Sequence, residues 1–309
     1  MSAPIGRLAP SPTGLLHLGH ARTFLLAWWQ IRSQSGTIVM RLEDLDGPRC
    51  EPRYADAALR DLEWLGLDWD GPALVQSHGL TRLNAAVHEL LANGQAYPCV
   101  CSRGDVLRAQ SAPHAGESEP RYPGTCRGRF ATLEEAERLT GREAGLRLLV
   151  PEGSIQIDDG FAGKHEWDVA RDVGDFLIAR RDKAPAYQLA VTVDDDASGV
   201  DTVLRGDDLL PSTARQWHVQ RALGLPHPRW FHVPLVVDEN GRRLAKREAA
   251  LSLDELRAAG TDPRQIVAWA AKSAGMPVEG LVTARELIAR FDLSRVPRAP
   301  WKHAQLEPK

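Results

Sequence analysis

Apolar and polar residues along the first third of the chain follow two alternating periods. Short apolar runs at residues 5–9 and 37–42 are typical of buried strands, and the segments around them repeat apolar residues at helical spacing. Those helical segments cover residues 15–33, 54–65 and 81–93. Because strands that alternate with helices build parallel βαβ units, we expect residues 1–95 to form the first half of a doubly wound, Rossmann-type parallel sheet.

The pattern changes between residues 99 and 128, where the chain is polar, rich in Ser, Pro and Gly, and holds three of its four cysteines. One short helix and then strands separated by Gly and Asp turns are expected up to about residue 182. The βαβ pattern returns near residues 187–193, and it continues with a helix at 213–223 and a strand at 234–237. The segment 253–291 has helical spacing.

These changes divide the chain into four expected parts of one α/β protein. Residues 1–95 and 187–250 are the two halves of the parallel sheet, and residues 96–186 are a domain inserted between them. Residues 251–309 form a short helical C-terminal region.

Composition narrows the class of protein. The chain has 309 residues, 43% of them hydrophobic and 26% charged, so it can bury a sizeable core. No run approaches the roughly 20 apolar residues of a membrane-spanning helix, and the N-terminus lacks the features of a signal peptide. We therefore expect a cytoplasmic protein with no membrane partner, in which four cysteines serve metal binding or burial rather than disulfides.

Charge is unevenly distributed along the chain. The formal net charge is −3, but from Arg205 onward 17 Lys and Arg residues stand against 12 Asp and Glu residues. This excess is compatible with a polyanion that docks on the last third, and equally with solvated helix faces.

The most informative motif follows the first apolar run. A turn at Pro10-Ser11-Pro12-Thr13-Gly14 leads into His17-Leu18-Gly19-His20 and a helix start. Backbone N–H groups at a helix N-terminus attract phosphate, Gly19 permits close approach to the backbone, and His17 and His20 can stabilise charge that builds on a triphosphate. Taken alone, the motif fits ordinary core histidines equally well.

A second candidate lies after the last expected strand, where a turn at 238–241 leads to Arg242, Arg243, Lys246 and Arg247. Taken alone, this segment indicates a surface loop. Because it would lie on the opposite half of the same sheet from the histidines, the two elements together indicate an ATP site that neutralises departing pyrophosphate.

Several segments together resemble the class I aminoacyl-tRNA synthetases of the glutamyl group, and most closely its short paralogues that glutamylate queuosine in tRNA(Asp). The segments 6–14 and 17–20 resemble the first signature of the family, and 41–46 and 203–210 resemble segments around its amino-acid pocket. Residues 243–247 resemble the second signature (KMSKS-like) loop, although Ala245 replaces the usual serine.

The resemblance implies the following site residues. Glutamate would contact Arg7, Ala9, Ser11, Glu43, Tyr187 and Arg205. ATP, with Mg²⁺, would contact Pro12, Thr13, Gly14, His17, Gly19, His20 and Lys246, of which His17, His20 and Lys246 are the catalytic residues.

Cysteine spacing adds a metal site. Cys99, Cys101 and Cys126 with Tyr122 offer three thiolates and a phenolate for one structural Zn²⁺ per chain, although His114 competes as the fourth ligand. The zinc-bearing members of the family match this chain at Cys99, Cys101, Tyr122 and Cys126, so the resemblance favours Tyr122 as the fourth ligand. It also makes 96–186 the domain that binds the acceptor. Cys50 lies apart and is expected to be uninvolved.

The implied partners are ATP, L-glutamate and queuosine-containing tRNA(Asp). Only 63 residues follow Lys246, which we interpret as a helical region without an anticodon-binding domain. Glutamyl-adenylate would form without tRNA, and a hydroxyl of the queuosine ring would then take the glutamate. The alternatives are a truncated glutamyl-tRNA synthetase that charges a 3′ end, a non-catalytic RNA-binding paralogue, and a small-molecule nucleotidylyltransferase.

Overall fold

The computed structural model describes residues 2–109, 120–239, 241 and 252–302. Its central strands run parallel: β1 (Ile5–Leu8) pairs with β2 (Thr37–Leu42), β2 with β3 (Leu74–Val75), and β9 (Thr202–Gly206) with β10 (Arg229–Val233). Strand β9 lies beside β1, and the N–H of Asp201 donates to the carbonyl of Ile5 at 3.0 Å. The spatial order β3-β2-β1-β9-β10 confirms the expected parallel sheet of an α/β fold.

Both faces of this sheet are apolar because side chains alternate along buried strands. Ile38 and Met40 of β2 pack into one core cluster, while Val39 between them packs against the other. In strand β9, Leu204 packs into the same cluster as Ile38 and Met40, and Val203 packs into the other.

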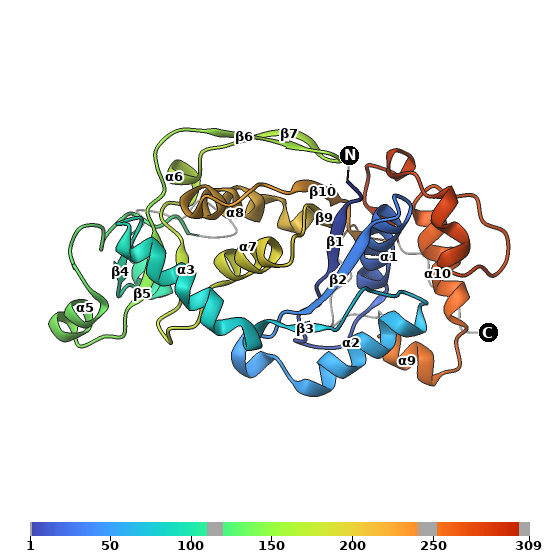
Figure 1. Cartoon of the computed structure of the whole chain (residues 1–309), viewed down its shortest axis with the longest axis horizontal. Helices are drawn as coiled ribbons and strands as arrows, with labels where there is room; N and C mark the ends of the chain where they lie inside the picture. The colour runs from blue at the N-terminus through green and yellow to red at the C-terminus, as the bar shows by residue number, and fades with distance from the viewer. Residues whose placement is uncertain (1, 110–119, 240, 242–251, 303–309) are drawn as a thin grey trace.

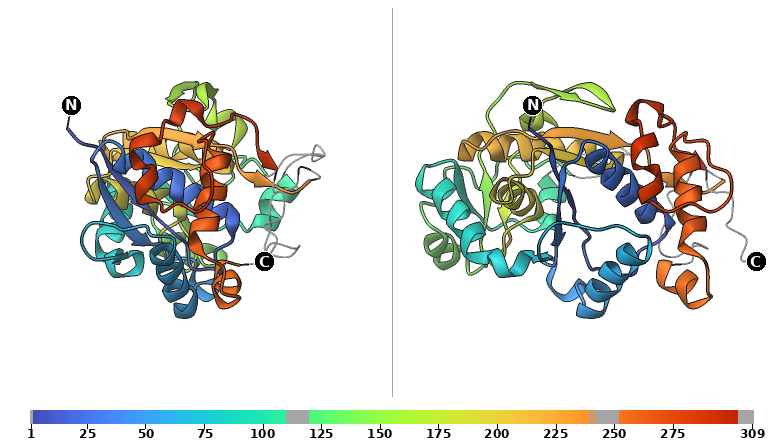
Figure 2. Two further views of the ribbon diagram at one scale, coloured as in Figure 1. Left: turned by 90° about the vertical axis from the view of Figure 1, so that its right-hand side faces the viewer. Right: turned by 45° about the vertical axis from the view of Figure 1, so that its right-hand side comes forward.

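Helices cover both faces. In Figure 1, α1 (Leu18–Arg32) and α10 (Pro263–Ser273) lie on one side of β1 and β2, and α3 (Leu80–Ala92), α7 (Tyr187–Ala197) and α8 (Leu210–Leu223) lie on the other. Both views of Figure 2 show the orange-red C-terminal helices beside the blue helix α1, in agreement with the packing of α10 on α1.

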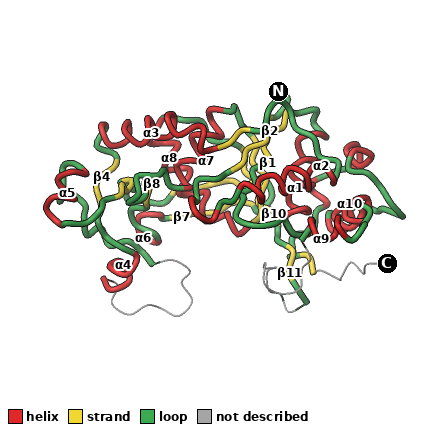
Figure 3. The backbone as a smooth tube through the Cα atoms, turned by 90° about the horizontal axis from the view of Figure 1, so that it is seen from below, coloured by secondary structure: helices red, strands yellow, loops and turns green. Residues whose placement is uncertain are grey.

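The segment expected as an insertion forms antiparallel sheets. Strand β5 (Gly145–Leu148) pairs with β4 (Ala96–Cys99) and β8 (Leu177–Ala179), while β6 (Ile155–Asp159) pairs with β7 (Gly163–Trp167). Figure 3 shows β4 at the opposite end of the molecule from α10. The remaining elements are α2 (Pro52–Trp64), α4 (Arg103–Ala109), α5 (Leu133–Thr140), α6 (Val169–Asp172), α9 (Leu253–Ala258), β11 (Val236–Val237) and β12 (Trp301–Lys302).

Two expectations need correction. Residues 187–193 do not resume the sheet, because they belong to helix α7, and the strand that does so is β9. The β-branched residues of this segment suggest a strand, but Leu189, Ala190 and Val193 face one core at helical spacing. The strand expected at 234–237 is shortened to β11, since Pro234 has no N–H to donate.

The helical tail is also interrupted. Between α10 and β12 the chain forms two 3₁₀ turns, Arg285–Arg290 and Leu293–Arg295, instead of continuing as α-helix. In the ranges described above, no helix combines the length and apolar content needed to cross a bilayer.

Candidate active site and cysteine cluster

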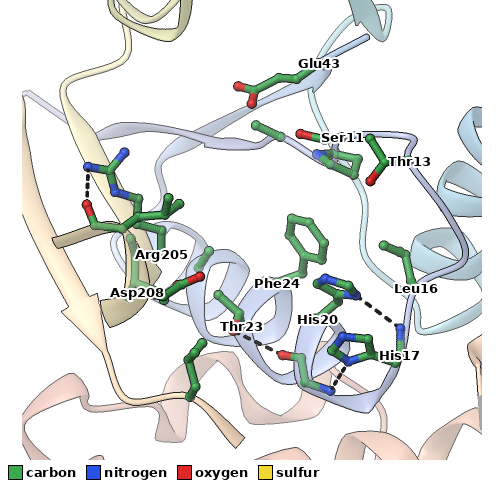
Figure 4. Close-up of a pocket in the computed structure, with 18 of the residues that line it drawn as sticks. Ser11, Thr13, Leu16, His17, His20, Thr23, Phe24, Glu43, Arg205 and Asp208 are labelled. Atoms are coloured by element: carbon green, nitrogen blue, oxygen red, sulfur yellow. Dashed lines mark hydrogen bonds between the residues drawn. The ribbon is translucent and has the colours of Figure 1, made fainter. Parts of the chain in front are cut away.

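A cavity of about 500 Å³ opens where β1 and β9 end. This is the point at which strand order reverses between the two halves of the sheet, where ligands bind in doubly wound folds. Figure 4 shows Arg205 and Glu43 on one side of the cavity and His17 and His20 at the start of α1 on another.

His17 and His20 form the N-terminal cap of α1. The Nδ1 atom of His17 accepts the N–H of Gly19 at 3.1 Å, and Nδ1 of His20 accepts the N–H of His17 at 3.2 Å. Their rings stack with centroids 3.8 Å apart. Because both Nδ1 atoms accept hydrogen bonds, each neutral ring carries its proton on Nε2.

The structure also gives a local reason for the glycine between them. A Cβ atom on Gly19 would lie 3.0 Å from Cε1 of His17, which is closer than ordinary packing allows. Gly19 therefore makes room for the capping imidazole, whatever ligand approaches the helix.

Glu43 belongs to a buried chain of alternating charges. The Nη2 atom of Arg41 contacts Glu43 Oε1 at 2.9 Å and Asp195 Oδ1 at 2.7 Å, and Asp195 Oδ1 lies 3.5 Å from Nε of Arg7. Burial opposes the charge of Arg41, but Asp195 and Glu43 outweigh it and hold the pKa of its guanidinium above the ordinary value. The contact with Arg41 thereby fixes the side chain of Glu43 at the cavity wall.

Arg205 is held by different chemistry. It is buried on β9, where Nε donates to His232 Nε2 at 2.9 Å and Nη2 donates to Thr213 Oγ1 at 2.9 Å. Burial lowers the pKa of this guanidinium. Tyr187, on the first turn of α7, lines the same cavity and leaves 39% of its surface exposed.

The structure brings most of the expected site residues to this one cavity. Pro12 is an exception: it is buried behind the lining, where its carbonyl accepts the N–H of Glu51 at 3.2 Å. Lys246 and the rest of the second signature loop lie outside the described residues. The expected residues that line the cavity are Arg7, Ala9, Ser11, Thr13, Gly14, His17, Gly19, His20, Glu43, Tyr187 and Arg205.

Comparisons with known proteins agree on one family. The family of tRNA synthetases class I (E and Q), catalytic domain, matches residues 5–307. The glutamyl-Q tRNA(Asp) synthetase of Nocardia farcinica is 45% identical over 296 residues, which cover 96% of this chain and 92% of the relative. This chain belongs to the glutamyl-Q tRNA(Asp) synthetase family. The member from Symbiobacterium thermophilum is 44% identical over 305 residues, covering 96% and 94% of the two chains.

Solved structures confirm the fold of this family member. A glutamate tRNA ligase from Elizabethkingia meningosepticum superposes with a TM-score of 0.83 at 23% identity, covering 98% of this chain and 67% of the ligase. The catalytic core of the synthetase is therefore built as a class I α/β fold.

Three of the four cysteines of this synthetase form a cluster, and none of them lines the cavity. The Sγ atoms of Cys99, Cys101 and Cys126 all lie within 4.8 Å of one another. Tyr122 places its phenol oxygen 3.4 Å from the Cys99 sulfur and 3.9 Å from the Cys101 sulfur. Tetrahedral zinc with Zn–S bonds of about 2.3 Å separates its sulfurs by about 3.8 Å, so these donors fit a zinc ion.

Two further expectations concern Cys50 and the alternative fourth ligand His114. Cys50 is free and half-buried, and it is not part of the cluster. His114, the competing fourth ligand, lies outside the described residues.

Sequence reasoning missed three residues that support the cavity, namely Arg41, Asp195 and His232. Asp195 lies eight residues after Tyr187, which is the spacing of one helix face, but that signal is visible only once 187–197 is known to be a helix. His232 is the register partner of Arg205 across β10 and β9, which sequence periodicity does not reveal.

Proposed function

We propose that this synthetase activates L-glutamate with ATP and transfers it to the queuosine at the wobble position of tRNA(Asp). The observation that carries the proposal is the 44–45% identity to glutamyl-Q tRNA(Asp) synthetases over nearly their full length. The charges of the cavity support the same substrate.

Glutamate carries two carboxylates and one ammonium group, and the cavity offers Arg7 and Arg205 against Glu43. Planar guanidinium groups suit carboxylates, and the fixed carboxylate of Glu43 suits the ammonium. The hydroxyl of Tyr187 would donate a hydrogen bond to one of the carboxylates. Ala9 and Ser11 would complete the pocket.

ATP would lie toward the start of α1, over Thr13, Gly14 and Gly19. There the helix N-terminus and the Nε2 protons of His17 and His20 favour phosphate oxygens. The α-carboxylate of glutamate attacks the α-phosphorus and pyrophosphate leaves. Mg²⁺ bound with ATP would neutralise charge on the phosphates.

Lys246 would act on the same phosphates. It lies six residues before Ser252, and Ser252 forms an isolated backbone bridge with His17. The assignment of Lys246 to this role rests on the resemblance of residues 243–247 to the second signature loop of the family. A lysine there stabilises negative charge that passes to pyrophosphate.

The cysteine cluster would hold one structural Zn²⁺, with Cys99, Cys101, Tyr122 and Cys126 as ligands. We propose this ion as the organising centre of the acceptor-binding domain at residues 96–186, between the sheet halves at 1–95 and 187–250. A bound metal would stabilise a segment that has a small apolar core of its own.

The decisive experiment is glutamylation of defined tRNAs. Radiolabelled glutamate should attach to tRNA(Asp) that contains queuosine, and attachment should persist when the 3′-terminal adenosine has been removed. Unmodified tRNA(Asp) transcript is the matched control and should remain unlabelled. Labelling of unmodified tRNA(Glu) at its 3′ end would instead identify a truncated glutamyl-tRNA synthetase, and no labelling of any tRNA would favour a non-catalytic paralogue.

Activation is tested separately. ATP–pyrophosphate exchange should require L-glutamate and proceed without tRNA, and glutamine should be a poor substrate because its neutral amide loses a charge-assisted contact worth about 1.5–3 kcal/mol. Arg7→Ala should mainly impair glutamate use. Equal exchange with aspartate or glutamine would refute the assignment of the cavity to glutamate.

A further inference from the structure

Arg205 differs from Arg41 in what holds it. Two carboxylates neutralise Arg41, whereas the partners that the described residues give Arg205 are neutral. They are His232 Nε2 at 2.9 Å, Thr213 Oγ1 at 2.9 Å and the carbonyl of Leu209 at 3.4 Å. Arg205 is therefore oriented by neutral groups and forms no ion pair with them. Its positive charge remains available for a substrate carboxylate.

The bond to Arg205 fixes the tautomer of His232. An arginine Nε–H can only donate, so Nε2 of His232 must present a lone pair. The proton of the neutral ring then lies on Nδ1, which donates to Asp159 Oδ2 at 2.6 Å. Burial lowers the pKa of His232 despite the neighbouring carboxylate, in keeping with a neutral ring.

Asp159 is itself held from the other side. Its Oδ1 atom accepts three backbone N–H groups, from Phe161 at 2.9 Å, Ala162 at 2.7 Å and His232 at 3.1 Å. At the next position a Cβ atom on Gly160 would lie 2.2 Å from a ring carbon of Phe231. The turn of the β6–β7 hairpin is thus packed directly on β10, along which it runs in Figure 1.

We propose that Asp159 and His232 are positioning residues for amino-acid recognition: Asp159 sets the tautomer of His232, and His232 aims the guanidinium of Arg205 at a glutamate carboxylate. The inference rests on the proposed function. It makes the β6–β7 hairpin, which does not line the cavity, a contributor to glutamate affinity.

The ring of His232 has three polar partners, because Thr213 Oγ1 also lies 3.2 Å from the Nε2 atom that accepts from Arg205, while Nδ1 faces Asp159. Two substitutions of His232 separate the contacts of Nε2 from the contact of Nδ1. Asparagine can reach Asp159 but leaves Arg205 without its acceptor, whereas glutamine can place a carbonyl oxygen where Nε2 lies. In ATP–pyrophosphate exchange, His232→Asn should raise the KM for glutamate at least 10-fold, with kcat and the KM for ATP within 3-fold of the parent. His232→Gln should stay within 3-fold for all three. His218→Asn, which removes another buried imidazole, is the matched control and should change none of them.

Asp159→Asn tests the tautomer. Because Oδ1 accepts three N–H groups, the amide oxygen must occupy that position, and the amide nitrogen then faces Nδ1 of His232. The ring must then carry its proton on Nε2. This N–H would face the Nε–H of Arg205, so two donors would oppose each other and the hydrogen bond to Arg205 would be lost. We expect a KM for glutamate at least 10-fold higher in the parent background and no further rise when the change is added to His232→Gln.

The outcomes are separable. A folded His232→Asn variant with an unchanged KM, or an equal effect of Asp159→Asn in both backgrounds, would overturn the inference while leaving the proposed function intact. If the wild-type protein supports no glutamate-dependent exchange, the proposed function fails instead. Should the variants not fold, ¹⁵N NMR of the wild-type ring decides: the inference requires a protonated Nδ1 and a bare Nε2, and the opposite tautomer refutes it.

Discussion

At the scale of single residues, Tyr122 is the least usual member of the cysteine cluster. Its phenol oxygen lies among the thiols and also accepts the N–H of Cys126 at 2.8 Å. The ring is covered by Arg147, whose guanidinium carbon lies 3.7 Å from the ring centroid and whose Nε donates to the Cys99 sulfur at 3.2 Å. Arg147 thus places a positive charge against both the ring of Tyr122 and the sulfur of Cys99.

Tyr122→Phe should therefore weaken zinc binding by about 10-fold or more, because a ligand is lost while the ring and its packing remain. Competition with a chelator measures the change. Tyr97→Phe is the control, since the Tyr97 hydroxyl donates to Asp175 rather than to the cluster. If Tyr122→Phe binds zinc as tightly as the parent, the fourth zinc ligand must be another residue, such as His114.

The site residues that the sequence identified are mostly those whose side chains line the cavity. Arg7, Glu43 and Arg205 stand in segments that resemble the signatures of the family, and their two guanidinium groups and one carboxylate complement the two carboxylates and one ammonium group of glutamate. Arg41 and Asp195 contact other protein groups instead, and their pairing joins strand β2 to helix α7, which lie far apart in the sequence. Periodicity carries no information on such contacts between distant segments.

At the scale of elements, α1 uses one residue for two purposes. His17 caps the helix and also points its ring into the cavity. Asparagine is a good N-cap residue without an imidazole, so substitution can separate the two roles.

His17→Asn should keep the thermal stability of the parent, whereas His17→Ala should lose about 1 kcal/mol. Both should slow ATP–pyrophosphate exchange by about 10²-fold or more, because the donor to the phosphates is absent. Thermal unfolding and exchange rates on the same preparations check this. If the His17→Asn enzyme keeps the exchange rate of the parent, His17 caps helix α1 and has no role in the reaction.

The contact between α2 and α9 contains a buried acid. Burial raises the pKa of Asp61 to about 6, although Arg257 lies 3.4 Å away and opposes the shift. An ordinary aspartate titrates near 3.8, so between the two values the folded protein keeps a proton that the unfolded chain releases. The stability that Asp61 contributes below pH 4 is therefore lost as the pH rises through 6.

Asp61→Asn should remove this loss. The free energy of unfolding of the variant should exceed that of the parent by up to about 3 kcal/mol at pH 7, with little difference at pH 4. Urea denaturation at both pH values gives the comparison. Asp254→Asn, which alters the exposed partner of the same arginine, should not reproduce it. Parallel pH dependences for Asp61→Asn and parent would contradict this account.

At the scale of the whole molecule, the two sheet halves meet at Ile5 and Asp201. The backbone N–H of Ile5 donates to the Asp201 carboxylate at 3.0 Å, and the N–H of Asp201 returns a bond to Ile5. Asp201→Ala should cost about 1 kcal/mol and speed hydrogen exchange in β1 and β9 together. Asp201→Asn retains an acceptor and should behave as the parent. Faster exchange confined to β9 would argue against this link between the halves.

The sequence predicted the parallel sheet because its buried strands are short apolar runs between amphipathic helices. It did not predict which strand joins β1. Residues 187–193 and 202–206 are both rich in β-branched and aliphatic side chains, and only the packing of α7 between α3 and α8 assigns the first of them to a helix.

The meeting of β1 and β9 also has a consequence for how the protein is made. Because 196 residues separate Ile5 from Asp201, a ribosome that adds about 5–20 residues per second releases β1 some 10–40 s before its neighbour emerges. Throughout that interval an apolar strand has an open edge that can pair with other nascent chains. Synonymous codons that slow translation before residue 201 should therefore lower the soluble yield, measured by fractionating cell extracts, while the folded enzyme keeps the same specific activity.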